Sequence, residues 1–543
     1  MNLKGVTRNY SWQLAKAVTA FLTVILYSRL LGSQLRGGLS LYLLYLQLAM
    51  MINELVVGSV MANWFVQFEF KQLTRRLWWV SGLVLGIFAF LGFFVFHWGW
   101  VTLPLVALGA TLIRQNMVIN LFQSRDMIEL RNQWQFRYEA LKLLLLLISF
   151  GATYLIALSG NQLPEFVQNG FNDFFSALSN SNPMDAIYFL ILSVLALAGL
   201  IWWWLSSPMV ELVLASSGSV DTAKNSPLIN NSANIEPPVS FTTLNSELTV
   251  DDFISKEPSA SYTDVPLNSK VTTDNVAINL PASQEAKFGW AEIKDGVMAQ
   301  LGHLILFLIY RMPIFMCSAW MLNIWGFNTE ETFPSNQGYL DFTGLAGVLS
   351  NVLLIADSLW IFANSLGGMV HARLLQPEML TRSEASQNRW IWRFFVLSIF
   401  GTAVLALVTA VIPKSLYVLI FGPDFGDMAV FLKIILPGIL ALGISAVLGH
   451  VLHARNQFVN LLWNHTMGLG GMLLFWWILR KPHWPSEMNF ANYVLLGFNF
   501  ALLIVMMLNF FSMGEDFRKR IKTPRNILIT LQLLIRFIRN RTR

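Results

Sequence analysis

Lysine, arginine and histidine side chains occur inside segments that are otherwise apolar. An ionised side chain at the centre of a bilayer costs about 2.5–3.5 kcal/mol on insertion scales, so a charge that is kept there is a candidate for function. Such a cation binds an anion, pairs with a carboxylate, or extends along its own alkyl chain to the membrane surface. The cationic candidates are Lys16, Arg29, Arg114, His303 and Arg311.

Two acidic side chains, Glu54 and Asp357, stand in the middle of apolar segments. Two interpretations are open for both. Each carboxylate can exchange a proton or bind Na⁺ as part of a functional cycle, or it can be the buried partner of a cation such as Arg114 or Arg311. Pro313 and Pro437 also fall in apolar segments, and a proline inside a helix removes a hydrogen bond and bends the axis. We therefore predict hinges at these two prolines.

Membrane-spanning helices are the elements that must hold these side chains. Of the 543 residues, 55% are hydrophobic and 13% are charged, and the mean hydropathy is +0.54. A soluble domain cannot bury so much apolar surface, and a helix needs about 20 apolar residues to cross a bilayer. We predict an all-α polytopic membrane protein with twelve spans, at 10–32, 39–66, 77–98, 101–122, 138–159, 185–207, 291–322, 342–370, 391–412, 427–452, 458–479 and 490–512.

Basic residues concentrate in every second connection between these segments. Lysine and arginine follow the second, fourth, eighth and twelfth predicted spans, whereas 99–100, 160–184 and 323–341 contain neither. Cytoplasmic loops of membrane proteins carry an excess of Lys and Arg. The pattern predicts an inner-membrane-type protein with both termini in the cytoplasm. The exceptions, which fall in connections predicted to lie outside, are Arg36, Lys414, Arg480 and Lys481.

A long polar segment divides the chain into two halves of six predicted spans. Residues 208–288 are rich in Ser, Asn, Thr and Pro, a composition typical of disordered linkers. At the C-terminus, apolar and arginine residues alternate at helical spacing, which predicts a basic amphipathic helix on the membrane surface. The predicted organisation is an N-terminal lobe at 1–207, a cytoplasmic linker at 208–288, a C-terminal lobe at 289–513 and a tail at 514–543.

Several classes of function find no support in the sequence. Cys317 is the only cysteine, which excludes an internal disulfide and a thiolate metal cluster. His450, His453 and His465 do not have the spacing of a metal site. The sequence has no P-loop, the motif that would indicate direct use of ATP. It also has no basic patch interleaved with aromatics, which would indicate nucleic-acid binding. We predict no cofactor, no metal and no nucleic-acid partner.

Three regions resemble one family of membrane proteins. Leu31-Gly32, Arg36-Gly37 and 39–42 are similar to the start of the second helix in bacterial polysaccharide flippases, the Wzx-like translocases of the multidrug/oligosaccharidyl-lipid/polysaccharide exporter superfamily. Residues 300–311 resemble the start of that family's second half, and 421–425 with 436–438 resemble its tenth helix and the loop before it. Where the family commonly has an aspartate after the Tyr-Arg pair, this chain has Met312-Pro313. The resemblance therefore does not extend to ion coupling through an aspartate there.

The resemblance implies two six-helix lobes around a V-shaped central cavity that opens alternately to each side. The implied substrate is an oligosaccharide on a polyprenyl diphosphate, carried from the cytoplasmic to the outer leaflet for surface polysaccharide synthesis. The first candidates to bind the diphosphate are Lys16, His303 and Arg311, and the next are Arg114 and Arg29. The partners of such a protein would be the lipid-linked oligosaccharide, membrane lipids and other polysaccharide-assembly membrane proteins. H⁺, Na⁺ or the membrane potential, worth about 2.3 kcal/mol per charge per 100 mV, would drive the step.

Two alternatives to the flippase remain. A membrane oligosaccharide polymerase or ligase is an enzyme that needs a large outward-facing loop with catalytic groups, whereas the long connection here is predicted to be cytoplasmic. A multidrug or cation exporter of the same superfamily would have acidic walls around its cavity, whereas the first and seventh predicted spans carry cations. We therefore expect a transporter that is not an enzyme.

Overall fold

The computed structural model describes most of the apolar part of the chain. The regular elements of the described residues are all helices, as the composition predicts. Ranges described are 3–67, 70–124, 127–158, 183–224, 290–318, 342–375, 379, 381–480, 487–515 and 517–518. The helices are α1 Leu3–Gln67, α2 Phe70–Phe90, α3 Thr102–Ser124, α4 Ile128–Leu158, α6 Pro183–Lys224, α8 Trp290–Phe315, α10 Phe342–Leu374, α12 Glu384–Val411, α13 Lys414–Phe421, α14 Met428–Ala454, α15 Phe458–Ile478 and α16 Glu487–Ser512, with short turns η1 Leu91–Val95, η2 Gly99–Val101 and η3 Pro423–Phe425.

Nine helical segments of the described residues are long and apolar enough to cross a membrane. The protein is therefore a helical, multi-pass membrane protein. The first segment, Ser11–Leu55, is 45 residues long and takes in the first predicted span and much of the second. The predicted spans at 138–159 and 458–479 fall on α4 and α15, which are helical but are not among the nine.

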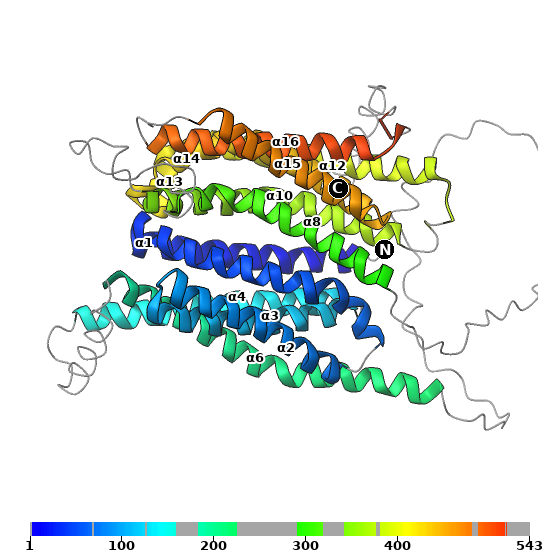
Figure 1. Cartoon of the computed structure of the whole chain (residues 1–543), viewed down its shortest axis with the longest axis horizontal. Helices are drawn as coiled ribbons and strands as arrows, with labels where there is room; N and C mark the ends of the chain where they lie inside the picture. Colours follow the sequence, from blue (N-terminus) through cyan, green and yellow to red (C-terminus); the bar gives the residue numbers. More distant parts are fainter. Residues whose placement is uncertain are drawn as a thin grey trace, which may run out of the picture.

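Helix α1 occupies the middle of the molecule. Figure 1 shows α2, α3, α4 and α6 on one side of α1, and α8, α10 and α12 to α16 on the other. We call these the N-terminal set and the C-terminal set. Helix α1 packs against α10 and α8 of the C-terminal set and against α4, α3 and α2 of the N-terminal set. It is therefore the element through which both sets are in contact.

A break at Gly32 divides α1 into two parts. The backbone of Gly32 has φ 68° and ψ −176°, a left-handed conformation that glycine adopts without steric cost. In Figure 1 the blue ribbon of α1 crosses the molecule from the N-terminus and turns back on itself. The backbone N–H of Ser33, at the start of the second part, donates to the Asp424 carboxylate at 3.3 Å. A carboxylate from the C-terminal set thus caps a helix end in α1.

Helix α6 is longer than the sequence predicts. The linker was expected to begin at residue 208, but α6 continues through Pro208 to Lys224. Val210 and Val213 are three residues apart and are both buried, in one cluster with Leu77 and Trp134. Their packing explains why the helix persists there. The rest of the predicted linker and tail residues 519–543 lie outside the described residues.

Candidate functional site

A close contact joins the second part of α1 to the first turns of α10. A Cβ atom added to Gly37 would overlap the carbonyl oxygen of Thr343, and one added to Gly347 would overlap that of Ser33. Glycine at both positions lets the two backbones approach closely. The Ser40 hydroxyl donates to the Ser350 hydroxyl across this contact at 2.9 Å. We call it the α1–α10 seam.

Arg36 is buried in this seam and keeps only 6% of its surface exposed. Its Nε donates to Oδ1 of Asn351 at 3.3 Å, and its guanidinium lies 5.7 Å from the centre of the Tyr27 ring. The Asn351 amide donates in turn to the Ser28 hydroxyl at 2.6 Å. Among the described residues, no carboxylate pairs with Arg36. A buried guanidinium whose partners are all neutral carries a large desolvation cost, which makes Arg36 a candidate functional residue.

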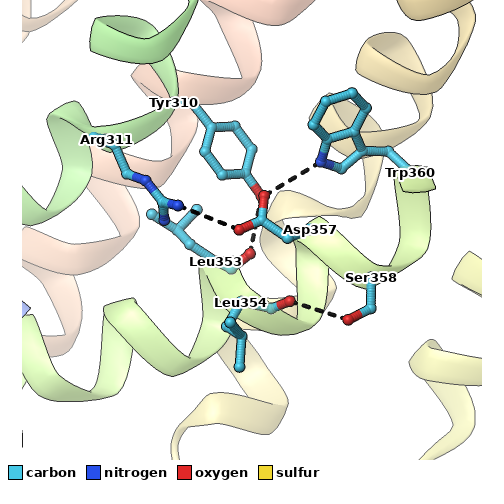
Figure 2. Close-up of polar contacts among 7 residues, drawn as sticks. All are labelled: Tyr310, Arg311, Leu353, Leu354, Asp357, Ser358 and Trp360. Atoms are coloured by element: carbon cyan, nitrogen blue, oxygen red, sulfur yellow. Dashed lines mark hydrogen bonds and ion pairs between the residues drawn. The ribbon is translucent and has the colours of Figure 1, made fainter. Parts of the chain in front are cut away.

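Arg311 lies in a second cluster, on the facing sides of α8 and α10 (Figure 2). Its Nη2 donates to Oδ2 of Asp357 at 3.3 Å, and Nε1 of Trp360 donates to the other carboxylate oxygen at 3.3 Å. The Tyr310 hydroxyl donates to the carbonyl of Leu353 at 2.9 Å, one turn before Asp357. Of the two interpretations open for Asp357, the structure brings the carboxylate to Arg311. The pair is not sealed, since the two side chains are 20% and 27% exposed.

Arg36 and Arg311 belong to one electrostatic region. Arg36 is hydrogen-bonded to Asn351, and Asp357 lies six residues further along α10, about 9 Å along a helix axis. The charge of Arg311 acts on Arg36. Arg311 is paired with Asp357 and Arg36 has neutral partners, so these three side chains together carry one positive charge in excess between α1, α8 and α10. Such an arrangement suits an anionic ligand.

The other candidate cations have different surroundings. Nζ of Lys16 donates to Oε1 of Gln135 on α4 at 2.9 Å, beside the Glu139–Lys142 ion pair. Nε of Arg29 donates to the carbonyl of Ile420 at 3.0 Å. Lys16 thus faces the N-terminal set, whereas Arg29 reaches the last turn of α13. These two residues are not brought to Arg311.

Arg114 and Glu54 lie between α1, α3 and α6 of the N-terminal side. The Arg114 guanidinium is 5.8 Å from the centre of the Trp203 ring. Glu54 accepts a hydrogen bond from the Asn116 amide at 2.6 Å. Asn116 is two residues from Arg114 on α3, and side chains at this spacing do not face each other, so the bond to Asn116 does not bring Glu54 to Arg114. Whether they bind an ion or only each other stays a prediction.

His303 belongs to a group of histidines that the sequence did not predict. Its ring centre is 6.2 Å from that of His453, and His453 is hydrogen-bonded to His371 at 3.1 Å. His450 lies 6.2 Å from His371 between ring centres. The one signal in the sequence was the spacing of His450 and His453, which puts both rings on one face of a helix.

The two predicted hinges differ in their surroundings. Pro313 stands two residues before the end of α8. Pro437 lies inside α14, where Asn499 of α16 bridges the break. The Asn499 amide donates to the carbonyl of Ile434 at 2.6 Å and accepts from the N–H of Gly438 at 3.1 Å. These are the two groups that an unbroken helix would join to each other, so a neighbouring helix supplies the hydrogen bonds beside Pro437, and a hinge there stays a prediction.

Arg36 is the site residue that sequence analysis missed. The sequence places it in the connection between the first two predicted spans, where it is an exception to the charge pattern and not a candidate site residue. The glycines around it, Gly32 and Gly37, were the available signal of a close approach.

Comparison of the chain with known proteins gives no match. No family model, no curated protein and no solved structure is similar to it.

Proposed function

We propose that the protein is a flippase that carries a polyprenyl-diphosphate-linked oligosaccharide from the cytoplasmic to the outer leaflet of a bacterial inner membrane. In this proposal the twelve spans form two six-helix lobes around a central cavity, with both termini in the cytoplasm. The observation that carries it is the positive charge in excess between α1, α8 and α10, where Arg311 is paired with Asp357 and Arg36 has neutral partners.

A lipid diphosphate brings about two negative charges into the membrane, and cations placed there offset the loss of hydration. Arginine suits this task because its planar fork binds two phosphate oxygens at once. In the present arrangement Arg36 is buried and Arg311 is held by Asp357. A diphosphate would take Asp357's place on Arg311 and reach Arg36 when the α1–α10 seam opens.

This exchange of partners also provides a route for coupling. When the diphosphate displaces Asp357 from Arg311, the free carboxylate is in apolar surroundings and favours taking up a proton or Na⁺. The membrane potential adds to the same direction of transport, at about 2.3 kcal/mol per charge per 100 mV. Hydroxyl and amide groups of the seam, such as Ser28, Ser40 and Asn351, supply neutral hydrogen bonds to the same headgroup.

The test is flipping of a fluorescent oligosaccharide diphosphate lipid in proteoliposomes, with Arg36→Gln, Arg311→Gln and the control Lys414→Gln. Lys414 is exposed and paired with Asp427 at the surface. We expect each of the first two variants to flip the lipid at least about tenfold more slowly, because each removes a charge-assisted contact, and the control to match the unmodified protein. In the native host, the two arginine variants should lose surface polysaccharide and accumulate the lipid-linked intermediate.

Equal rates for all four proteins would overturn the proposal. Transport of an organic cation instead of the lipid would favour the exporter alternative. Lengthening of the glycan chain by the purified protein would favour the polymerase alternative.

A further inference from the structure

Four of the seven histidines gather where α8, α10 and α14 meet. His303 comes from α8, His371 from α10, and His450 and His453 from α14. The ring centres of His371 and His453 are 5.0 Å apart, and those of His303 and His453 are 6.2 Å apart. We call these four residues the histidine cluster. It lies in the last turns of α10 and α14, so it joins three helices near one end of the C-terminal set.

The bond at the centre of the cluster constrains how many protons it can hold. Nε2 of His371 and Nδ1 of His453 are 3.1 Å apart. A hydrogen bond between two imidazole nitrogens needs a hydrogen on one and a lone pair on the other. The pair is therefore compatible with two neutral rings or with one excess proton shared between them. A second excess proton would put hydrogens on both facing nitrogens and break the bond.

In the part of the chain that the structure describes, charged groups outside the cluster do not compensate a proton bound to its rings. The charges that act on His450 and His453 are those of other cluster histidines. Nε2 of His450 contacts Oδ1 of Asn364, a neutral group, at 3.0 Å. No carboxylate among the described residues contacts one of the four rings.

The helices packed around the cluster carry ionisable side chains that are bound elsewhere. His465 of α15 contacts the carbonyl of Gly302 through Nδ1 at 2.8 Å. Arg455, just after α14, donates to Asn388 of α12 at 2.8 Å and also senses the charge of Glu384. Lys16 of α1 is bound to Gln135, and Arg311 and Asp357 are bound to each other. Other charged groups on these helices include Arg373 of α10 and Arg389 and Arg393 of α12.

The four rings are not completely covered by the rest of the described protein. His303 is exposed, and the other three rings are partly exposed. Burial lowers the pKa of His371, which lies beyond the apolar span of α10. Because the folded arrangement then binds fewer protons than free histidines would, it is stabilised above the ordinary histidine pKa and loses stability as the pH falls below it.

We propose that His303, His371, His450 and His453 form a proton-binding site whose occupancy controls how closely α8, α10 and α14 pack. One excess proton is shared along the His371–His453 bond. Further protons break that bond and place like charges on three helices, which separates them. The proton site stands by itself, and its use as the coupling site of transport rests on the proposed function.

The test uses the full chain, labelled with ¹⁵N-histidine, in lipid bilayers. Solid-state NMR follows the ring nitrogens between about pH 8 and pH 5, the range in which histidine titrates. In the unmodified protein we expect one hydrogen-bearing and one bare nitrogen across the His371–His453 bond, and both rings should change together on acidification. In His453→Gln the midpoint of His371 should move by about half a pH unit or more.

His97→Asn is the matched control. His97 is exposed, lies outside the cluster and has φ 53°, a conformation that asparagine tolerates. We expect it to leave the titration of His371 and His453 unchanged. The same titration with Zn²⁺ present distinguishes a metal site from a proton site.

Two results would overturn the proposal. One is independent titration of His371 and His453 with the same midpoints in the unmodified protein and in His453→Gln. The other is stoichiometric Zn²⁺ binding by the four rings. The measurement on the unmodified protein decides the question even if a variant fails to fold. In proteoliposomes, loss of the pH dependence of flipping in His371→Gln would link the site to transport, and an absence of flipping would count against the proposed function alone.

Discussion

Polar side chains are buried between apolar helices in two regions, of which one contains a charged side chain and the other contains neutral ones. The α1–α10 seam holds Arg36 among neutral partners. The second region lies inside the C-terminal set, and we call it the amide network. There the Asn464 amide donates to Asn509 at 2.8 Å and to Ser512 at 3.1 Å, and the Asn509 amide donates to Ser445 at 2.7 Å.

The difference between them lies in charge and in what it connects. The amide network is neutral, its donors and acceptors are matched, and it joins α14, α15 and α16 of one set. Matched neutral groups are stable without a ligand. The seam joins α1 to the C-terminal set and buries a charge that its own partners do not neutralise. We infer that the amide network holds a set together, whereas the seam is built to exchange its partners.

The largest effect should come from filling the seam. Gly37→Val would push a side chain into the backbone of Thr343 and Gly347, and overpacking of this kind costs about 1–3 kcal/mol or more. We expect the second part of α1 and α10 to be held apart at the seam. The measurement is oxidative cross-linking of Ser40→Cys with Ser350→Cys, whose hydroxyls are 2.9 Å apart in the unmodified protein.

Gly86→Val is the control for this substitution, because a Cβ at Gly86 meets nothing within 4 Å. The cross-link should form in the control and be lost in Gly37→Val. Equal cross-linking in both would show that the seam tolerates the bulk.

Breaking the amide network should lower stability without touching transport. Asn509→Leu removes one acceptor of the Asn464 amide and the donor to Ser445, and we expect the free energy of unfolding to fall by about 1–3 kcal/mol. Denaturant unfolding in detergent measures this, with the exposed Asn460→Leu as the control. A specific loss of flipping per folded molecule would instead give this network the role that we assign to the seam.

Removing the carboxylate sharpens the contrast in charge. Asp357→Asn leaves Arg311 without its acidic partner, so a diphosphate no longer has to displace it. We expect polyprenyl diphosphate to bind about tenfold more tightly and to be released more slowly. Equilibrium binding to the purified protein measures the first effect, and Asp427→Asn serves as the surface control. Weaker binding would show that Asp357 positions Arg311 instead of competing for it.

The smallest effect belongs to a charge pair outside both regions. Lys414 and Asp427 are 3.2 Å apart, but their side chains are 63% and 52% exposed. A double-mutant cycle should give a coupling free energy below about 1 kcal/mol, as for other exposed pairs. The cycle, measured by thermal unfolding, would contradict this view of surface charge if the coupling approached that of the buried groups.

Much of the architecture could be predicted before the structure was seen. Nine helical segments of the described residues are long and apolar enough to cross a membrane, and this could be predicted because about 20 consecutive apolar residues are a local property of the chain. The predicted end of this helix at residue 207 was wrong, because the packing of Val210 and Val213 against other helices stabilises a longer α6. For Asp357 the sequence left two interpretations open, and pairing with Arg311 depends on the distance between α8 and α10.

The sequence by itself determined that the protein is helical, that it lies in a membrane, and that a few ionisable side chains remain inside apolar segments. Only the tertiary structure decided which of them meet. Arg36 and Asn351 are 315 residues apart in the chain, and the histidine cluster draws on three helices. Hydrophobicity is additive along a segment and can be summed from the sequence. A hydrogen bond or an ion pair depends on a few ångströms between distant segments, which only the packing of the helices sets.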